Sequence, residues 1–259
     1  MAASITSNRQ AAEQSRPNTA GEPAAAPEWQ RQNTFVATLA HELRQPLSAM
    51  LAAMAVARRA PGSDAARRAD DVMQRQLGQM GRLLEDLVDA TRWARGQVSL
   101  DKQPLDLRDI MRDAAADAAF AVADAGQQLA IIDARESVWI SGDRQRLRQV
   151  VSNLLRNAVK YTPRDGRITL AIERMAWTVT LRVADSGRGI EADALPHVFD
   201  LFSQAHPEAD PGLGIGLAVA REIVLRHGGS IDARSEGIGH GSEFLIRLPL
   251  TGLSPCNAA

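Results

Sequence analysis

The chain has 259 residues, 45% of them hydrophobic, which is enough to bury a sizeable core in one or two domains. The formal charge at pH 7 is −1 and basic residues are spread along the chain, so neither nucleic acid nor an anionic membrane is an expected partner. A single cysteine, Cys256, excludes an intramolecular disulfide; without a signal peptide or an apolar run of ~18 residues we expect no membrane contact and a cytoplasmic location.

The first predicted element is a helix that follows a flexible leader. Residues 1–32 are rich in Ala, Ser, Asn, Gln, Glu and Pro without periodicity, and such a composition buries too little apolar area to offset the cost of ordering. From Asn33 the pattern is helical, and one face is apolar. That face holds Phe35, Leu39, Leu43, Pro46, Met50 and Met54. His41, Gln45 and Ser48 project to the other side.

A turn and a second helix follow. The turn signal at residues 61–64, Pro-Gly-Ser-Asp, ends the first helix and offers Ser63 or Asp64 as a cap for the next. The second helix carries apolar residues spaced alternately by four and three, as in a coiled-coil seam. These residues are Met73, Leu77, Met80, Leu84, Leu87, Thr91 and Ala94. A hairpin with one seam can complete its core with a copy of itself, so residues 33–97 are predicted to form a homodimeric four-helix bundle.

Residues 98–251 mix helical and strand patterns and are predicted to form a second domain, followed by a tail at 252–259. Helices are expected at Leu107–Ala125 and Arg144–Lys160, the latter capped by Asp143. Four strands are expected, at Leu129–Ile132, Arg167–Glu173, Trp177–Ala184 and Phe244–Leu248. Because helices and strands do not alternate regularly, the fold class is α+β, an α/β sandwich with helices on one face of a mixed, mostly antiparallel sheet.

One edge of the second of these helices carries Asn153, Asn157 and Lys160 beside an apolar stripe. Two amides and a lysine suit a magnesium-bound polyphosphate, because Mg²⁺ takes few protein oxygens and shares its octahedron with phosphate and water. Taken alone, this edge is more economically explained as the solvated face of an amphipathic helix.

Two glycine-rich segments strengthen the phosphate interpretation. Asp185 ends a strand and is followed by glycines that allow close backbone approach to a ligand. A Gly-x-Gly-x-Gly run at residues 212–216 then opens a helix, whose N-terminus favours phosphate. Either segment alone could be a turn or a loop. In this order, about thirty residues apart, the three motifs together predict a nucleotide site.

Over residues 33–250 the sequence resembles the sensor histidine kinases of bacterial two-component systems. The similar segments are FVATLAHELRQPL at 35–47, NLLRNAVKYTP at 153–163, DSGRGI at 185–190, VFDLF at 198–202, GLGIGL at 212–217 and GHGSEF at 239–244. They are similar to the phosphoacceptor, asparagine, first glycine, phenylalanine and second glycine boxes and to the closing strand motif. The resemblance implies an ATP-dependent protein histidine kinase that autophosphorylates His41 and passes the phosphoryl group to an aspartate of a response-regulator receiver domain.

The resemblance also implies roles for single residues. Glu42 would polarise the His41 imidazole, and Gln45 stands where related chains use Thr or Asn to orient water for dephosphorylating the partner, so phosphatase activity is an open question. Asp185 would accept a hydrogen bond from the adenine amino group, and Asn157 would ligate Mg²⁺. The other implied ATP contacts are Asn153, Lys160, Tyr161, Gly187, Gly189, Ile190, Phe199, Gly212, Gly214, Gly216 and Leu217.

Two features bear on how the kinase would work. Pro46 removes the amide that would bond the Glu42 carbonyl and so loosens the helix near the phosphoacceptor. The expected lid, residues 191–211, has no Lys or Arg from Phe199 onward, although related lids often supply a cation to the terminal phosphate. Arg188 and Arg164 are candidates to replace it. The remaining histidines are interpreted as structural or surface residues: His197, His206, His227 and His240.

Other function classes are weighed against this one. ATPases and serine kinases of the same ATP-binding superfamily place a glutamate, as general base, one helical turn before the metal-binding asparagine. Here that position is Asn153, and an amide cannot take a proton, which favours histidine phosphorylation. A catalytically weak, nucleotide-binding dimeric scaffold is the other alternative, motivated by the lid.

Overall fold

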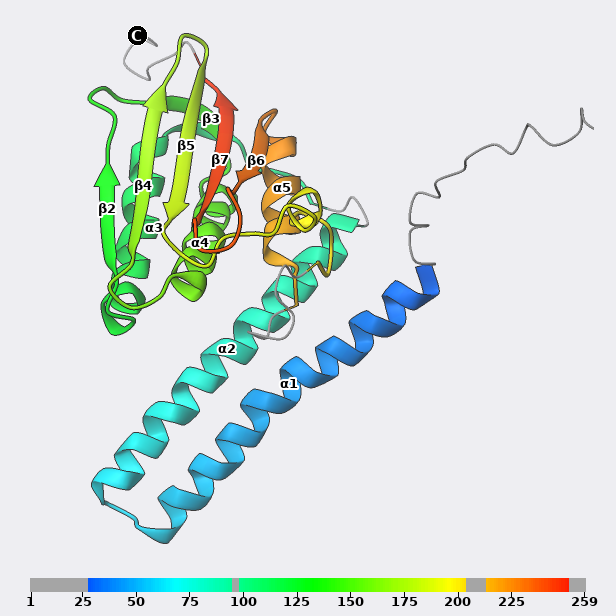
Figure 1. Ribbon diagram of the computed structural model, residues 1–259, viewed down its shortest axis with the longest axis vertical. Helices are drawn as coiled ribbons and strands as arrows, with labels where there is room; N and C mark the ends of the chain where they lie inside the picture. Colours follow the sequence, from blue (N-terminus) through cyan, green and yellow to red (C-terminus); the bar gives the residue numbers. More distant parts are fainter. Residues whose placement is uncertain (1–27, 95–97, 204–212, 252–259) are drawn as a thin grey trace, which may run out of the picture.

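The computed structural model describes residues 28–94, 98–203 and 213–251 (Figure 1). The expectations for residues 1–27, for Gly212 and for the tail at 252–259 lie outside these ranges. Two long antiparallel helices, α1 (Glu28–Arg59) and α2 (Asp64–Ala94), form the predicted hairpin. The boundary predicted at residue 32 is wrong, because α1 already includes residues 28–32. Glu, Gln and Arg in this segment favour helix, and each residue added to an existing helix gains one more backbone hydrogen bond.

The turn between the two helices has the predicted cap. The Ser63 hydroxyl accepts a hydrogen bond from the Ala66 amide (3.2 Å) and donates to the Ala60 carbonyl (2.6 Å). Gly62 has φ +75°, a conformation that costs glycine little. The hairpin is thus closed by local chemistry at residues 60–66, as its turn signal indicated.

The apolar residues of the hairpin lie on two surfaces. On α1, Pro46 and Ala53 are buried, whereas Met54, assigned to the same stripe, is 40% exposed. The apolar seam of α2 is likewise divided between a partly buried and an exposed surface, which corrects the expectation of one continuous apolar strip. Its partly buried members are Met73, Met80 and Leu87, and its exposed members are Leu77, Leu84 and Thr91.

The second domain is built on a five-stranded sheet with strand order β2-β4-β5-β7-β6. Strand β2 pairs in parallel with β4 and the other pairs are antiparallel, which confirms the mixed, mostly antiparallel α+β prediction. The strands are β2 (Gln128–Ile132), β4 (Arg167–Arg174), β5 (Thr178–Asp185), β6 (Ser230–Arg234) and β7 (Ser242–Pro249). A separate antiparallel pair joins β1 (Gln103–Asp106) and β3 (Trp139–Gly142).

Three helices cover one face of the sheet (Figure 1). They are α3 (Leu107–Asp124), α4 (Arg144–Tyr161) and α5 (Gly216–Arg226), and a short 3₁₀ turn lies at Leu195–His197. Their apolar stripes and the inward residues of β4, β5 and β7 form one continuous core. None of the helices in the described ranges is both long and apolar enough to cross a bilayer.

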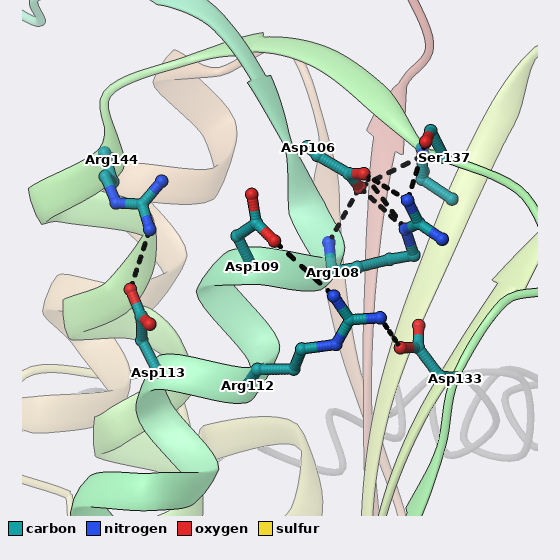
Figure 2. Close-up of polar contacts among 9 residues, drawn as sticks. Asp106, Arg108, Asp109, Arg112, Asp113, Asp133, Ser137 and Arg144 are labelled. Carbon is teal, nitrogen blue, oxygen red and sulfur yellow. Dashed lines mark hydrogen bonds and ion pairs between the residues drawn. The ribbon is translucent and has the colours of Figure 1, made fainter.

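Carboxylate caps fix where α3 and α4 begin. Asp106 accepts hydrogen bonds from the amides of Arg108 and Val138 (both 3.1 Å) and pairs with the Arg108 guanidinium (2.6 Å), which also reaches Ser137 (Figure 2). Burial by itself raises the pKa of Asp106, but the bonds from Arg108 and Val138 outweigh it and the net pKa is lowered. Asp143 caps α4, as predicted, by accepting from the Arg146 amide (3.1 Å).

A buried histidine connects the start of α4 to the end of α5. The Asp143 amide donates to His227 Nε2 (3.0 Å), and His227 Nδ1 lies 2.7 Å from the Ile223 carbonyl. A carbonyl only accepts, so the proton is on Nδ1 and the ring is neutral. His227 therefore has the structural role expected of it.

Candidate functional site

The carboxamide of Asn153 connects the asparagine helix α4 to the start of α5. Its side chain is buried, with the residue 3% exposed, and Nδ2 donates to the Gly216 carbonyl (2.9 Å). The Arg156 guanidinium donates to Oδ1 on the other side. Since a carbonyl accepts and a guanidinium donates, these two partners fix the orientation of the amide. The first of the predicted nucleotide residues thus touches the second glycine motif.

Asn157, Lys160 and Tyr161 continue the same edge of α4, and all three are partly buried. Lys160 Nζ lies 5.1 Å from the centroid of the Tyr161 ring. Within the described ranges the Asn157 carboxamide makes no hydrogen bond to protein, so both of its polar atoms are available to a ligand. The chemistry of this donor set, amide oxygens beside an ammonium group, fits Mg²⁺ with a polyphosphate.

Asp185 ends β5 with its carboxylate held by two donors. The Gly187 amide donates to Oδ1 (2.8 Å), and the Ser242 hydroxyl donates to Oδ2 (2.5 Å). Ser242 is the residue of β7 that pairs with Asp185 of β5. Each carboxylate oxygen has a second lone pair, so the group can still accept from a ligand. Ser242 belongs to the closing strand motif, and its pairing with Asp185 follows from strand register, which the sequence alone does not reveal.

The first glycine motif is crowded by backbone. A Cβ on Gly187 would lie 2.5 Å from the Tyr161 carbonyl, and one on Gly189, which has φ +77°, would lie 2.0 Å from the Gly237 carbonyl. The adjoining Ile190 is buried and its amide donates to the Ser235 hydroxyl (2.9 Å). These contacts bring the end of β5, the end of α4 and the loop before β7 together beside Asp185.

The lid is anchored at its described ends. The Phe199 ring meets Phe244 edge to face, with centroids 6.2 Å apart. The Phe202 amide donates to the Gly214 carbonyl (3.0 Å), which links the phenylalanine motif to the second glycine motif. Leu217, the second residue of α5, packs against the core. Residues 204–212, including Gly212, lie outside the described part of the lid.

The predicted phosphoacceptor lies on the other domain. His41 is exposed on α1, and Gln45 Nε2 lies 3.0 Å from its Nε2. With the amide assigned this way, the Gln45 nitrogen donates and the His41 Nε2 lone pair accepts. Glu42 is only 4% exposed, so it is not a solvated surface glutamate. Successive helical positions turn by about 100°, which separates the exposed imidazole from the buried carboxylate beside it.

A cleft of about 730 Å³ separates α2 from α4. A polar contact in the cleft joins the two domains: Asp89 of α2, which is 9% exposed, accepts from Arg146 (2.8 Å) and from Gln149 (2.6 Å) of α4. The lining residues are Arg82, Leu84, Glu85, Val88, Asp89, Arg92, Gln145, Arg146, Arg148, Gln149, Ser152, Asn153 and Arg156. The cleft thus reaches one predicted nucleotide residue, Asn153, but not His41.

The two arginines suggested as replacements for a lid cation lie outside this cleft. The Arg164 side chain packs over Gly126, at the loop before β2. Arg188 is exposed in the first glycine motif, where its amide donates to the Tyr161 carbonyl (3.0 Å). Neither residue lines the cleft between α2 and α4.

Comparisons with known proteins identify both parts of the chain. A family model described as the His Kinase A (phospho-acceptor) domain matches residues 31–96. A second, described as histidine kinase-, DNA gyrase B-, and HSP90-like ATPase, matches residues 142–252. The chain is 35% identical over 231 residues to the sensor histidine kinase TrcS of Mycobacterium tuberculosis, covering 85% of this chain and 44% of TrcS. It spans 28–44% of the length of three such curated relatives.

Solved structures show the same fold. Full-length ShkA in complex with AMPPNP is similar with a TM-score of 0.64 and 27% identity, covering 86% of this chain and 47% of ShkA. Histidine kinase ThkA in complex with the response regulator protein TrrA is similar with a TM-score of 0.63 and 20% identity, covering 86% of this chain and 64% of that one. At that identity the second match shows the fold alone.

Proposed function

This chain belongs to the sensor histidine kinases of two-component systems, and on that premise we propose that it phosphorylates His41 from ATP and passes the phosphoryl group to an aspartate of a response-regulator receiver domain. The observation that carries the proposal is the exposed His41 on α1, with its Nε2 lone pair directed at a single amide, beside a separate domain that gathers the nucleotide motifs. We place the domain boundary between residues 97 and 98 and the reaction in the cytoplasm.

Base recognition is proposed for the Asp185 end of the site. The carboxylate, oriented by Gly187 and Ser242, accepts the adenine amino group, and the same oxygens would repel the carbonyl of guanine. Tyr161 packs near the base, and Gly187, Gly189 and Ile190 let the backbone come close to it.

Phosphate and metal binding are proposed for the other end. Asn157 ligates Mg²⁺ with support from Asn153, while Lys160 contacts phosphate. The second glycine motif, including Gly214, Gly216 and Leu217, presents the N-terminus of α5 to the phosphates. Magnesium supplies charge neutralisation for the transferred group when bound.

The chemical step follows from the chemistry of an imidazole. The His41 Nε2 lone pair forms a P–N bond to the terminal phosphorus as the bond from that phosphorus to the bridging oxygen of ADP breaks. Gln45 must first release Nε2, because its amide occupies that lone pair. Glu42, the neighbour of His41 in sequence, is the proposed group that polarises the ring; because its carboxylate is buried and about 100° away around α1, it must turn toward the imidazole to do so. No general base is needed at Asn153, since the attacking nitrogen already carries its lone pair.

The phosphohistidine is the donor for the second step. An aspartate oxygen of the receiver domain attacks the phosphorus, forming a P–O bond as the P–N bond breaks and returning the electron pair to Nε2. The two-component family supports a receiver domain as the partner. Gln45 is also proposed to orient a water that attacks the phosphorus of the receiver's phosphoaspartate, which breaks the P–O bond to the aspartate and releases phosphate. We also propose a homodimer, because α1 and α2 keep an exposed apolar surface.

The test is incubation with γ-labelled ATP and Mg²⁺. Wild-type chain should take up label that is lost in acid and retained in base, as a phosphoramidate requires. His41→Gln should take up none while keeping its affinity for ATP, because acceptor and nucleotide site lie in separate domains. Label that survives acid or persists in His41→Gln would favour a serine kinase instead. Wild-type chain that binds ATP but stays unlabelled would favour the scaffold alternative.

A further inference from the structure

The proposed reaction needs positive charge at the terminal phosphate of ATP. Negative charge concentrates on that group as its bond to ADP breaks, and kinases neutralise it with metal ions and basic side chains. In this chain the lid sequence from Phe199 to Gly212 contains no Lys or Arg, and among the residues proposed above as ATP contacts only Lys160 is a cation. Another basic residue of the catalytic domain is needed to complete the site.

The direction of the site shows where that residue must lie. Asp185, the proposed base reader, is at the end of β5 and does not line the cleft between α2 and α4. Asn153 does line it, and α2 on the opposite wall belongs to the hairpin that carries His41. Because the terminal phosphate must be handed to the hairpin, it has to lie toward the cleft end of the site rather than the base end.

Arg156 occupies that end. It lines the cleft beside Asn153, one helical turn along α4, and its guanidinium donates to Asn153 Oδ1. The residue as a whole is exposed, so the side chain is at the mouth of the site rather than within the core. A guanidinium has five N–H donors in a planar fork and can keep the bond to Asn153 while donating to phosphate oxygens.

The other cleft arginines of α4 are directed to carboxylates away from the nucleotide motifs. Arg146 pairs with Asp89 of α2 (2.8 Å), and Arg148 pairs with Asp117 of α3 through two of its nitrogens (2.5 and 3.0 Å). Among the contacts within the described ranges, the bond from Arg156 to Asn153 is the one that joins a cleft arginine of α4 to a predicted nucleotide residue.

We propose that Arg156 binds the terminal phosphate of ATP, providing the cation that the lid lacks and positioning Asn153 through the same side chain. The inference rests on the proposed function, because it takes Asp185 as the base end and His41 as the acceptor. It differs from the sequence expectation, which named Arg188 and Arg164.

The experiment compares ATP with ADP, which differ by the terminal phosphate alone. Affinities for both, with Mg²⁺, are measured by calorimetry in the His41→Gln background so that nucleotide is not consumed. Arg156→Ala should weaken ATP binding about tenfold, the usual order for losing a charged hydrogen bond, while ADP binding changes by less than about twofold. Arg156→Lys should recover part of the ATP preference, since a lysine keeps the charge but loses the fork.

Arg148→Ala is the matched control, because it removes an arginine from the same helix and the same cleft without touching Asn153. It should leave both affinities unchanged, and thermal unfolding should show that every variant is folded. If Arg156→Ala lost the same affinity for ATP as for ADP, Arg156 would only support Asn153 and the inference would be overturned. Unchanged affinity for both nucleotides would overturn it as well. A His41→Gln chain that binds neither nucleotide would instead overturn the proposed function itself.

Discussion

At the scale of single residues, Asp185 shows how a carboxylate can be both structural and selective. Its two oxygens are each used once by the protein, by the Gly187 amide and by the Ser242 hydroxyl, which fixes the plane of the group. A rotating side chain would lose its directionality toward a base. The held carboxylate can present its remaining lone pairs only to a donor, and an adenine amino group is one.

Asp185→Asn should therefore weaken ATP binding by about tenfold and narrow the preference for ATP over GTP. The variant replaces one acceptor by an NH₂ donor, which can no longer accept from both Gly187 and Ser242. Ser242→Ala is a milder variant for comparison. It removes one of the two hydrogen bonds that hold the carboxylate and should weaken ATP binding less than Asp185→Asn does. Competition binding with both nucleotides measures the effect. Unchanged ATP affinity in Asp185→Asn would place the base elsewhere.

His227 makes stability depend on pH. Burial lowers the pKa of its imidazole, assisted by Lys102, while the bond to the Ile223 carbonyl and the charge of Asp143 act in the opposite direction. Protonation of Nε2 would also break the bond from the Asp143 amide that holds the start of α4. Because the folded pKa lies below the unfolded value of about 6.5, the unfolded chain binds the extra proton first as pH falls.

The free energy of unfolding should therefore be fully retained above about pH 6.5 and should decrease as pH falls from there toward the folded pKa of His227. Urea unfolding of wild type and His227→Gln at pH 8 and pH 5.5 tests this. Glutamine is not protonated in this range, so the variant should start lower at pH 8 but lose less on acidification. Parallel losses in both proteins would assign the acid sensitivity to other groups.

At the scale of elements, the sequence was most informative where local chemistry decides the structure. The caps at Ser63 and Asp143 and the long stripe of α4 were readable because they depend on neighbours in the chain. Strands β1, β3 and β6 were not predicted, since they lack the run of four apolar residues, Leu129–Ile132, that marks the equally short β2. Strand β5 was placed one residue early: Trp177 is 85% exposed in the turn before it.

The two-surface division of the α2 seam could not be read from spacing either. A four-three repeat gives a stripe wide enough to face both α1 and a second partner, and only packing shows which member does which. Leu77 is 60% and Leu84 50% exposed, while Leu47 and Leu51 of α1 are 48% and 54% exposed. This surface is what the proposed second copy would cover.

Leu84→Glu should therefore dissociate the dimer. Burying a leucine contributes about 1.5–3 kcal/mol, and two-fold symmetry places two unpaired carboxylates in one interface. Light scattering across a micromolar dilution series should show a dimer for wild type and a monomer for the variant. Phe120→Glu is the matched control, since Phe120 is 82% exposed on α3, outside the hairpin. A monomeric wild type, or a dimeric Leu84→Glu, would contradict the bundle.

At the scale of the whole molecule, the contacts between the domains were beyond reach of the sequence. Within the second domain, the first residues are held to the end of α5: Arg226 donates to the Val98 carbonyl (3.1 Å), and Lys102 donates to the Arg226 carbonyl (2.8 Å). Between the two domains, Asp89 of α2 accepts from Arg146 and Gln149 of α4. Residues more than fifty positions apart form these bonds, and their pairing depends on how two folded units meet rather than on any local pattern.

Asp89 should act as a brake on phosphorylation. Its ion pair holds α4 against α2, and in this arrangement the cleft that contains Asn153 does not include His41. The catalytic domain must therefore leave this position before the phosphoryl group can be transferred. The Asp89 and Arg146 side chains are only 12% and 19% exposed, so water screens their attraction less than it screens a surface pair.

Asp89→Asn should raise the initial rate of self-phosphorylation about five- to thirtyfold, the change expected if 1–2 kcal/mol of docking energy is lost from the held state. Nucleotide affinity should not change, because Asp89 belongs to the hairpin and lies outside the proposed ATP contacts. Asp117→Asn is the matched control. It weakens the ion pair between Arg148 of α4 and Asp117 of α3, which lies within one domain rather than between the two domains. Initial rates with γ-labelled ATP measure the difference. A rate that is unchanged or lower in Asp89→Asn would mean that the contact belongs to the productive arrangement, so that the domain phosphorylates His41 without first leaving α2.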